Sequence, residues 1–144
     1  MKRVATIFAA ILSSSLLFAA SAPTPLTVGW STLKTLTSTQ ASSPALALNN
    51  KLVSVPGFMV PLEDDADEVT EFLLVPFSGA CIHVPPPPPN QIVYVKMLKT
   101  TKVHVTFTDP IVVTGTLQIS TVVSPYGDVS YDLSGETVLP YQPQ

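Results

Sequence analysis

Five consecutive prolines, Pro85–Pro89, limit what this 144-residue chain can fold into more than any other feature. Proline holds φ near about −65° and has no backbone N–H, so this segment can neither continue a sheet ladder nor lie inside a helix. We expect it to form a polyproline II rod. The segments on both sides are rich in β-branched and aromatic residues, as strands are: Leu73, Leu74, Val75 and Phe77 before it, and Ile92, Val93 and Val95 after it. The sequence therefore predicts two strands joined by a rigid crossover.

Cys81 and His83 lie in this crossover, just before the prolines. Residues two apart in extended backbone leave on the same face, so the thiol and the imidazole would be presented together. Zinc and monovalent copper accept such ligands, but a structural zinc site needs four protein ligands, and the chain has one cysteine and two histidines. The candidate third ligand is His104. Carboxylates of Glu63–Asp65, a partner chain or water would complete the site.

The first residues have the pattern of a secretory signal peptide. Lys2 and Arg3 precede an uncharged apolar run, Val4–Ala20, and small residues follow it. We expect cleavage after Ser21. We expect no lipid anchor, because no cysteine comes directly after the apolar run. The mature chain would then keep 5 of the 7 basic residues against 10 acidic ones, a net charge of about −5. A net-acidic secreted domain is a poor candidate for binding nucleic acid or anionic membrane surfaces.

Short alternating apolar runs, separated by turn signals, continue through the mature chain and are typical of an all-β fold. Pro56-Gly57 predicts a bulge or bend inside the first strand, and Gly115 predicts a second bulge or a close backbone approach. The acidic run Glu63–Glu68 is interpreted as a solvated loop. We expect strands over Lys51–Leu62, Lys102–Phe107 and Ile111–Gln118, with Val129–Leu133 plus Thr137–Leu139 closing the series, besides the two that flank the crossover. About six short strands and no convincing helix predict a small, closed or nearly closed barrel.

The predicted organisation has three parts: a signal peptide over residues 1–21, an N-terminal arm or linker over 22–49, and a β-barrel domain over 50–141. The arm is rich in Ser, Thr, Ala and Pro, as extended segments are. Within it, Trp30, Leu33 and Leu36 have the spacing of one amphipathic turn, and we expect the indole to pack on the body of the domain. Asn49 and Asn50 predict a turn before the first strand.

The segments VPGFMVPLE, GACIHVPPPPPNQ, DPIVVTGTL and YGDVSYDL carry a resemblance. In these segments the chain resembles the bacterial family catalogued as domain of unknown function 3299, over about residues 30 to 141. The resemblance implies a periplasmic domain with an OB-like β-barrel, and it suggests an ABC-type permease as partner and a role in metal handling. The chain departs from the family pattern at Asn50, where relatives usually have glycine, and in a longer segment over Lys99–Thr108. The resemblance carries over no catalytic residue.

Three functions remain open from the sequence. The first is a non-enzymatic binding module of the periplasm, accessory to an ABC-type transporter, with Cys81 and His83 as core residues. Its partner surface would be the rigid loop of Pro85, Pro86, Pro87, Pro88, Pro89 and Asn90. The alternative is a zinc- or copper-binding protein or metal chaperone that uses Cys81 and His83. The third, a thiol enzyme in which His83 lowers the pKa of Cys81, lacks an orienting group or a second cysteine, so we predict no enzyme activity.

Overall fold

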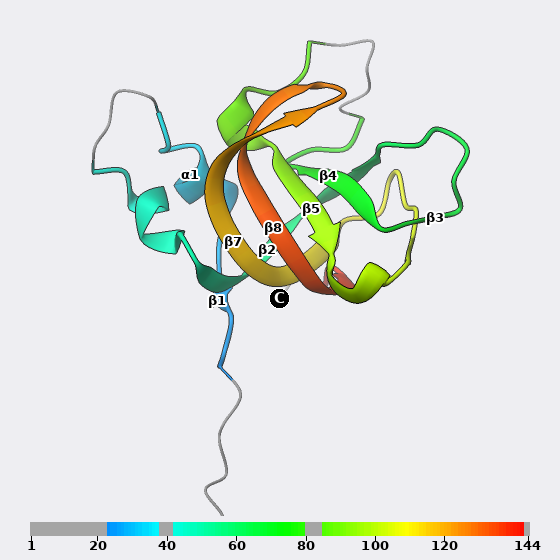
Figure 1. Ribbon diagram of the computed structural model, residues 1–144, viewed down its shortest axis with the longest axis horizontal. Coiled ribbons are helices and arrows are strands. Elements are labelled where there is room, and N and C mark those ends of the chain that lie inside the picture. The colour runs from blue at the N-terminus through cyan, green and yellow to red at the C-terminus, as the bar shows by residue number, and fades with distance from the viewer. Residues whose placement is uncertain (1–22, 38–41, 80–84, 143–144) are drawn as a thin grey trace, which may run out of the picture.

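The computed structural model describes residues 23–37, 42–79 and 85–142, and strands dominate these ranges (Figure 1). The predicted all-β class is confirmed. The predicted signal peptide lies outside the described residues. Among the described residues, no helix is long and apolar enough to cross a membrane. The elements in chain order are β1 (Leu26–Thr27), α1 (Trp30–Leu33), the 3-10 helix η1 (Pro44–Leu48), β2 (Lys51–Pro61), β3 (Glu68–Val69), β4 (Glu71–Val75), η2 (Pro89–Gln91), β5 (Val93–Met97), η3 (Leu98–Thr100), β6 (Val103–His104), β7 (Ile111–Ser124) and β8 (Gly127–Pro140).

The strand pairings close into a ring. β2 pairs with β4 and also with β7, β4 pairs with β5, β5 pairs with β8, and β8 pairs with β7. All these pairs are antiparallel except β5 with β8, which is parallel. The short strand β1 adds to β2 in parallel. A closed ring of this kind is what the predicted OB-like barrel requires, and it leaves few unpaired strand edges.

The Pro56-Gly57 step is the corner of the ring. β2 pairs with β7 up to Gly57, which lies opposite Ile111, and with β4 from Phe58 onward, which lies opposite Val75. A Cβ on Gly57 would lie 2.7 Å from the carbonyl oxygen of Val75. Glycine is therefore needed where the strand changes partners, and the bend predicted there is confirmed.

β7 and β8 form one long hairpin, whereas the sequence predicts separate short strands. Each is continuous over 14 residues. The pairing shifts register between Thr114 and Gly115 and again between Ile119 and Val122. Such bulges bend a strand without ending it, so two strands can follow the curve of the ring for their whole length. The bulge predicted at Gly115 is confirmed, and a Cβ there would clash with the carbonyl oxygen of Ser134.

The strand predicted over Lys102–Phe107 is mostly absent. Only Val103 and His104 pair, with the two-residue strand β3. Positive φ angles at Lys99 and Thr100 change the direction of the chain after β5. The segment that follows therefore pairs over only two residues, with β3. Phe107, at the end of the predicted strand, is 62% exposed.

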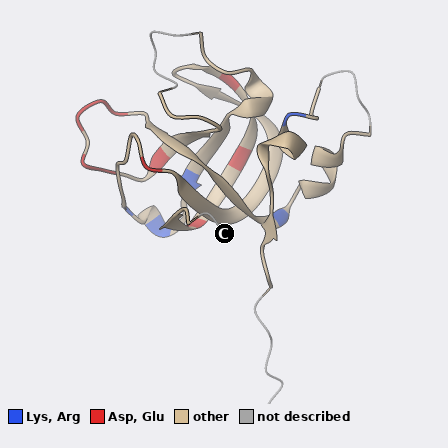
Figure 2. Cartoon of the chain, turned by 180° about the vertical axis from the view of Figure 1, so that it is seen from behind, with Lys and Arg blue, Asp and Glu red and all other residues tan. Residues whose placement is uncertain are grey.

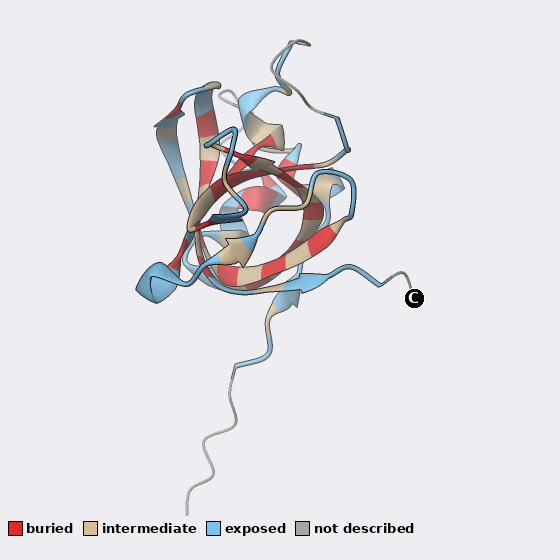
Figure 3. Cartoon of the chain, turned by 90° about the vertical axis from the view of Figure 1, so that its right-hand side faces the viewer, coloured by how far each residue is buried: buried red, intermediate tan, exposed pale blue. Residues whose placement is uncertain are grey.

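The barrel interior is filled by the inward side chains of the ring. Along β2 buried and half-buried residues alternate, as the period of a strand predicts (Figure 3). Among the described residues, no buried side-chain nitrogen or oxygen lacks a hydrogen-bond partner. The buried cluster includes Val53, Val55, Met59, Phe72, Leu74, Val93, Val95, Val113, Leu117, Tyr131 and Leu133.

Residues 23–37 and 42–49 of the predicted arm pack against the ring. Val28, Leu33 and Ala45 are buried in the same core cluster as the barrel strands. The hydroxyl of Tyr131 on β8 donates to the carbonyl oxygen of Leu33 at 2.6 Å. The amphipathic turn predicted around Trp30 is the helix α1, and the indole N–H donates to the carbonyl oxygen of Pro56 at 2.6 Å. The arm therefore covers one side of the barrel and is more than a linker.

Candidate functional site

The crossover between β4 and β5 is the candidate site that the sequence predicts. Cys81 and His83 belong to residues 80–84, outside the described residues, so the predicted ligand pair remains a prediction. His104, the predicted third ligand, is on β6 with an 85% exposed side chain, and its Nε2 lies 3.7 Å from a carboxylate oxygen of Glu68. Within the described ranges, no three His, Cys, Asp or Glu side chains come together as metal ligands would.

The proline segment divides between irregular backbone and a short 3-10 helix. Pro85–Pro88 have no regular secondary structure, and Pro88 has φ −56° and ψ 152°, which is polyproline II geometry. Pro89 instead begins the 3-10 helix η2, so the predicted rod does not include Pro89. Proline's fixed φ suits both conformations, and only ψ distinguishes them. Pro85, Pro86, Pro88 and Pro89 are exposed, and Pro87 is half-buried.

Asn90 fastens the end of this segment to the N-terminal arm. Its side-chain amide donates to the carbonyl oxygens of Lys34 and Leu36, both at 2.9 Å. Asn90 belongs to the partner surface predicted from the sequence, and in the structure its amide is hydrogen-bonded within the chain. Ile92 follows and is buried. The C-terminal end of the proline segment is therefore held in place by the hydrogen bonds of Asn90 and by the packing of Ile92.

Exposed apolar side chains lie near the crossover. Phe77, on its N-terminal side, is 50% exposed, and Val123, at the end of the β7–β8 hairpin, is 80% exposed. η2 contacts both β8 and α1, and the tip of the β7–β8 hairpin and η2 lie toward the same end of the molecule, in the upper part of Figure 1. A second apolar cluster lies beneath them. Its buried members are Leu73, Val75, Ile92 and Val129, and Phe58, Val60, Leu62, Tyr94, Val122 and Tyr126 pack against it.

A network of charged and phenolic groups crosses strands β4, β5 and β8 beside this cluster. The Tyr94 hydroxyl donates to Oε2 of Glu71 at 2.5 Å, and the ammonium of Lys96 lies 2.8 Å from Oε1. Asp132 lies opposite Tyr94 in the β5–β8 pairing. This network is not among the features predicted from the sequence. The signal was a charged residue inside each apolar strand, Lys96 in VYVKM and Asp132 in SYDL.

The network shifts the pKa of its members in opposite directions. Hydrogen bonds from Lys96 and then from Tyr94 lower the pKa of Glu71 below 4.5. Burial, followed by the Glu71 carboxylate, raises the pKa of Tyr94 to about 12. Burial also raises the pKa of Asp132, although Lys96 opposes that shift. The arrangement thus keeps a carboxylate charged and a phenol protonated, which is a structural clamp between β4 and β5.

We expect Glu71→Gln to weaken this clamp in a pH-dependent way. Because the folded pKa of Glu71 is lowered, its contribution to stability is present above pH 4.5 and is lost as pH falls below that value. The pair is partly exposed, so the variant should cost no more than about 1 kcal/mol at pH 7. Urea unfolding of both proteins at pH 7 and pH 3 measures the difference, which should shrink at pH 3.

Glu136→Gln is the matched control, since Glu136 is an exposed carboxylate on β8. It should leave the free energy of unfolding nearly unchanged at both pH values. A Glu71→Gln difference that stays constant from pH 7 to pH 3 would contradict the lowered pKa of Glu71.

The acidic run between β2 and β3 is a loop, as predicted. Residues 62–67 contain no strand, and Glu63, Asp64, Asp65 and Asp67 are exposed. Figure 2 shows this loop as a red segment at one side of the domain. Glu68, at its end, is on β3 and lies 3.6 Å from the ammonium of Lys102. The loop therefore presents negative charge to solvent.

Comparison with known proteins gives a family match and a fold match. A family model described as a protein of unknown function (DUF3299) matches residues 29–140. The chain is also similar to the crystal structure of a DUF3299 family protein from Pseudomonas aeruginosa PAO1, with 32% sequence identity and a TM-score of 0.66. That match covers 85% of this chain and 99% of the other. No curated protein matches the chain significantly. Because neither description names a ligand or an activity, the function has to be argued from the surface.

Proposed function

The chain belongs to the DUF3299 family, and from that premise we propose that it is a non-enzymatic binding module of the periplasm which presents its proline crossover to another protein. One observation carries the proposal: Pro85, Pro86, Pro88 and Pro89 are exposed, while Asn90, directly after them, is hydrogen-bonded to the carbonyl oxygens of Lys34 and Leu36. An exposed apolar segment with a fastened end loses little conformational entropy on binding.

The partner that fits this surface has an aromatic-lined groove. Such grooves bind polyproline II segments in several unrelated protein domains, because the segment is preformed and its rings pack on aromatic faces. The exposed side chains of Phe77 and Val123 would extend the contact at the same end of the domain. An ABC-type permease, the partner class that the family resemblance suggests, is the first to test.

We expect the double variant Pro86→Ala, Pro88→Ala to lose the partner while it remains folded. Each replacement restores backbone freedom to the unfolded chain, at a cost of about 0.4 to 1 kcal/mol in stability. The larger effect should be on binding, because the preformed segment is lost. The measurement is retention of periplasmic proteins on the immobilised variant compared with wild type, followed by titration of the purified partner.

Pro23→Ala is the control, since Pro23 is exposed but lies in the N-terminal arm. It should retain the same proteins as wild type. Asn90→Ala removes two hydrogen bonds from the base of the segment and should weaken the partner's affinity although every proline is kept. If the double variant retains the same proteins with equal affinity, the crossover is not the partner surface.

A further inference from the structure

A groove lies on the outside of the ring, at the end of the domain where β1 and the C-terminal residues meet. It has a volume of about 420 Å³ and is lined by Thr27, Ser54, Pro56, Val112, Tyr141 and Gln142. These residues come from β1, β2, β7 and the segment that follows β8. The volume lies within the range of about 300 to 1,000 Å³ that small-molecule sites have.

The strand period places the groove residues on one face. Ser54 and Pro56 are two apart on β2, and Val112 lies opposite Pro56 in the pairing with β7. Thr27 of β1 lies beside Ser54. After β8 ends, the backbone N–H of Tyr141 still donates to the carbonyl oxygen of Pro110 at 2.9 Å, which holds Tyr141 at the groove.

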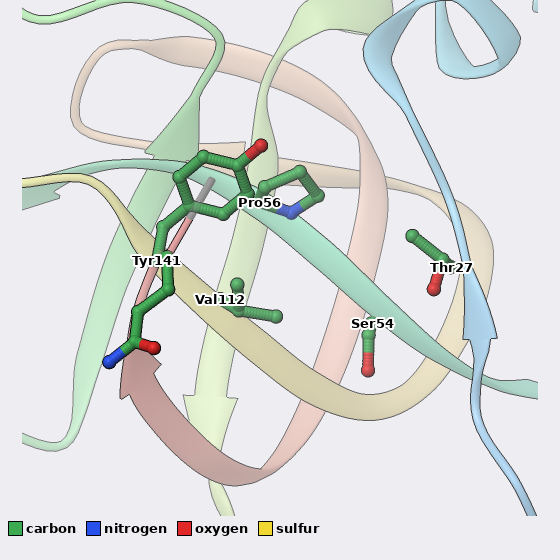
Figure 4. A pocket seen from close by; sticks show the side chains of 6 residues that line it. Thr27, Ser54, Pro56, Val112 and Tyr141 are labelled. Carbon is green, nitrogen blue, oxygen red and sulfur yellow. The ribbon is translucent and has the colours of Figure 1, made fainter. Parts of the chain in front are cut away.

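The groove has an apolar end and a hydroxyl end (Figure 4). The side chains of Tyr141, Pro56 and Val112 form the first, with the Tyr141 hydroxyl and the Gln142 amide at its edge, and the hydroxyls of Ser54 and Thr27 form the second. Ser54 and Thr114 share one hydrogen bond at 2.7 Å between their hydroxyl oxygens. That bond uses one of the two hydroxyl hydrogens, so the pair keeps one donor and free lone pairs.

Every residue that lines the groove is uncharged. An anionic ligand would find no cation there, and a cationic ligand would find no carboxylate. A wholly apolar ligand would bury the hydroxyls and the Gln142 amide without hydrogen bonds, which is costly. The ligand that matches both ends is neutral, with an apolar ring face and several hydroxyl groups.

We propose that this groove binds a pyranose unit of a neutral saccharide. The C–H face of the sugar packs against the ring of Tyr141, which is 42% exposed and therefore available for stacking. The sugar hydroxyls hydrogen-bond with Ser54, Thr27 and the amide of Gln142. The site is separate from the proline crossover and does not depend on the function proposed for it.

The test is titration of the purified protein with two neutral trisaccharides, maltotriose and fully N-acetylated chitotriose, monitored by NMR chemical-shift changes. At least one should bind and shift the signals of Tyr141 and its neighbours. Tyr141→Ala should weaken that binding at least tenfold, whereas Tyr141→Phe should keep most of it because the ring face remains. Ser54→Ala should weaken it as well. Phe107→Ala, a matched loss of an exposed aromatic side chain, should bind as wild type does.

Three results would overturn the proposal. One is that wild type binds neither trisaccharide. Another is that Tyr141→Ala binds as tightly as wild type, which would place the saccharide elsewhere. Glucuronic acid serves as the charged probe, and tighter binding of this acid than of the neutral sugars would also contradict an uncharged site. The variant Pro86→Ala, Pro88→Ala should bind the saccharide normally, which separates this test from that of the crossover.

Discussion

Gly115→Ala should cost more than about 3 kcal/mol in the free energy of unfolding, at or beyond the upper end of the usual range for overpacking a core. Gly115 is buried at the bulge between β7 and β8. A Cβ there would meet the carbonyl oxygen of Ser134, and the Cα of Gly135 would be 2.9 Å away. All these neighbours are backbone atoms, so no side chain can turn aside and the strands would have to separate.

Alanine substitutions at two further glycines provide a comparison for the stability cost of Gly115→Ala. At Gly135 the nearest atom to an added Cβ is the sulfur of Met97, at 2.7 Å. A methionine side chain is flexible, so Gly135→Ala should cost less than Gly115→Ala. At the exposed Gly29 the nearest atom is the Ser31 hydroxyl oxygen at 3.7 Å, and Gly29→Ala should change stability by about 0.5 kcal/mol or less. Urea unfolding measures all three. Equal effects at Gly115 and Gly29 would contradict the close approach of β7 and β8.

Leu33→Ala should cost about 2 to 5 kcal/mol, the usual range for removing a buried leucine side chain. Leu33 belongs to the N-terminal segment, yet it is 0% exposed and packs in the same cluster as the barrel strands. Its carbonyl oxygen also accepts the hydrogen bond from the buried Tyr131 hydroxyl. The substitution tests whether this segment is part of the domain, and thermal or urea unfolding provides the measurement.

Leu46→Ala is the matched control, because Leu46 lies in the same N-terminal segment but is 40% exposed. It should cost clearly less than Leu33→Ala. Were the two substitutions equally mild, the segment would behave as the flexible arm that its composition indicates.

The local features of the fold are predictable from the sequence. Pro56-Gly57 and Gly115 mark the corner and the bulge because they restrict or free the backbone at their own positions, whatever the partner strand is. The β-branched runs beside the crossover become β4 and β5 for the same local reason. The alternation over Lys102–Phe107 shows the limit of such patterns. It has the period of a strand, but only Val103 and His104 find a partner.

The candidate site is less predictable than the fold. Exposed prolines follow from composition, since a segment without N–H groups cannot pair in a sheet. The role of Asn90 does not, because its partners Lys34 and Leu36 are more than 50 residues away in the chain. The network of Glu71, Tyr94 and Lys96 likewise depends on the register between β4 and β5.

By itself, the sequence determined the all-β class, the corner at Pro56-Gly57 and the bulge at Gly115, because φ restrictions, missing side chains and the two-residue period act within a few residues. Only the tertiary structure decided that β5 pairs in parallel with β8, that Leu33 is part of the core, and that Tyr141 lies beside Pro56. Each of these depends on contacts between segments far apart in the chain. Such contacts are selected by the packing of the whole ring, and no local pattern specifies them.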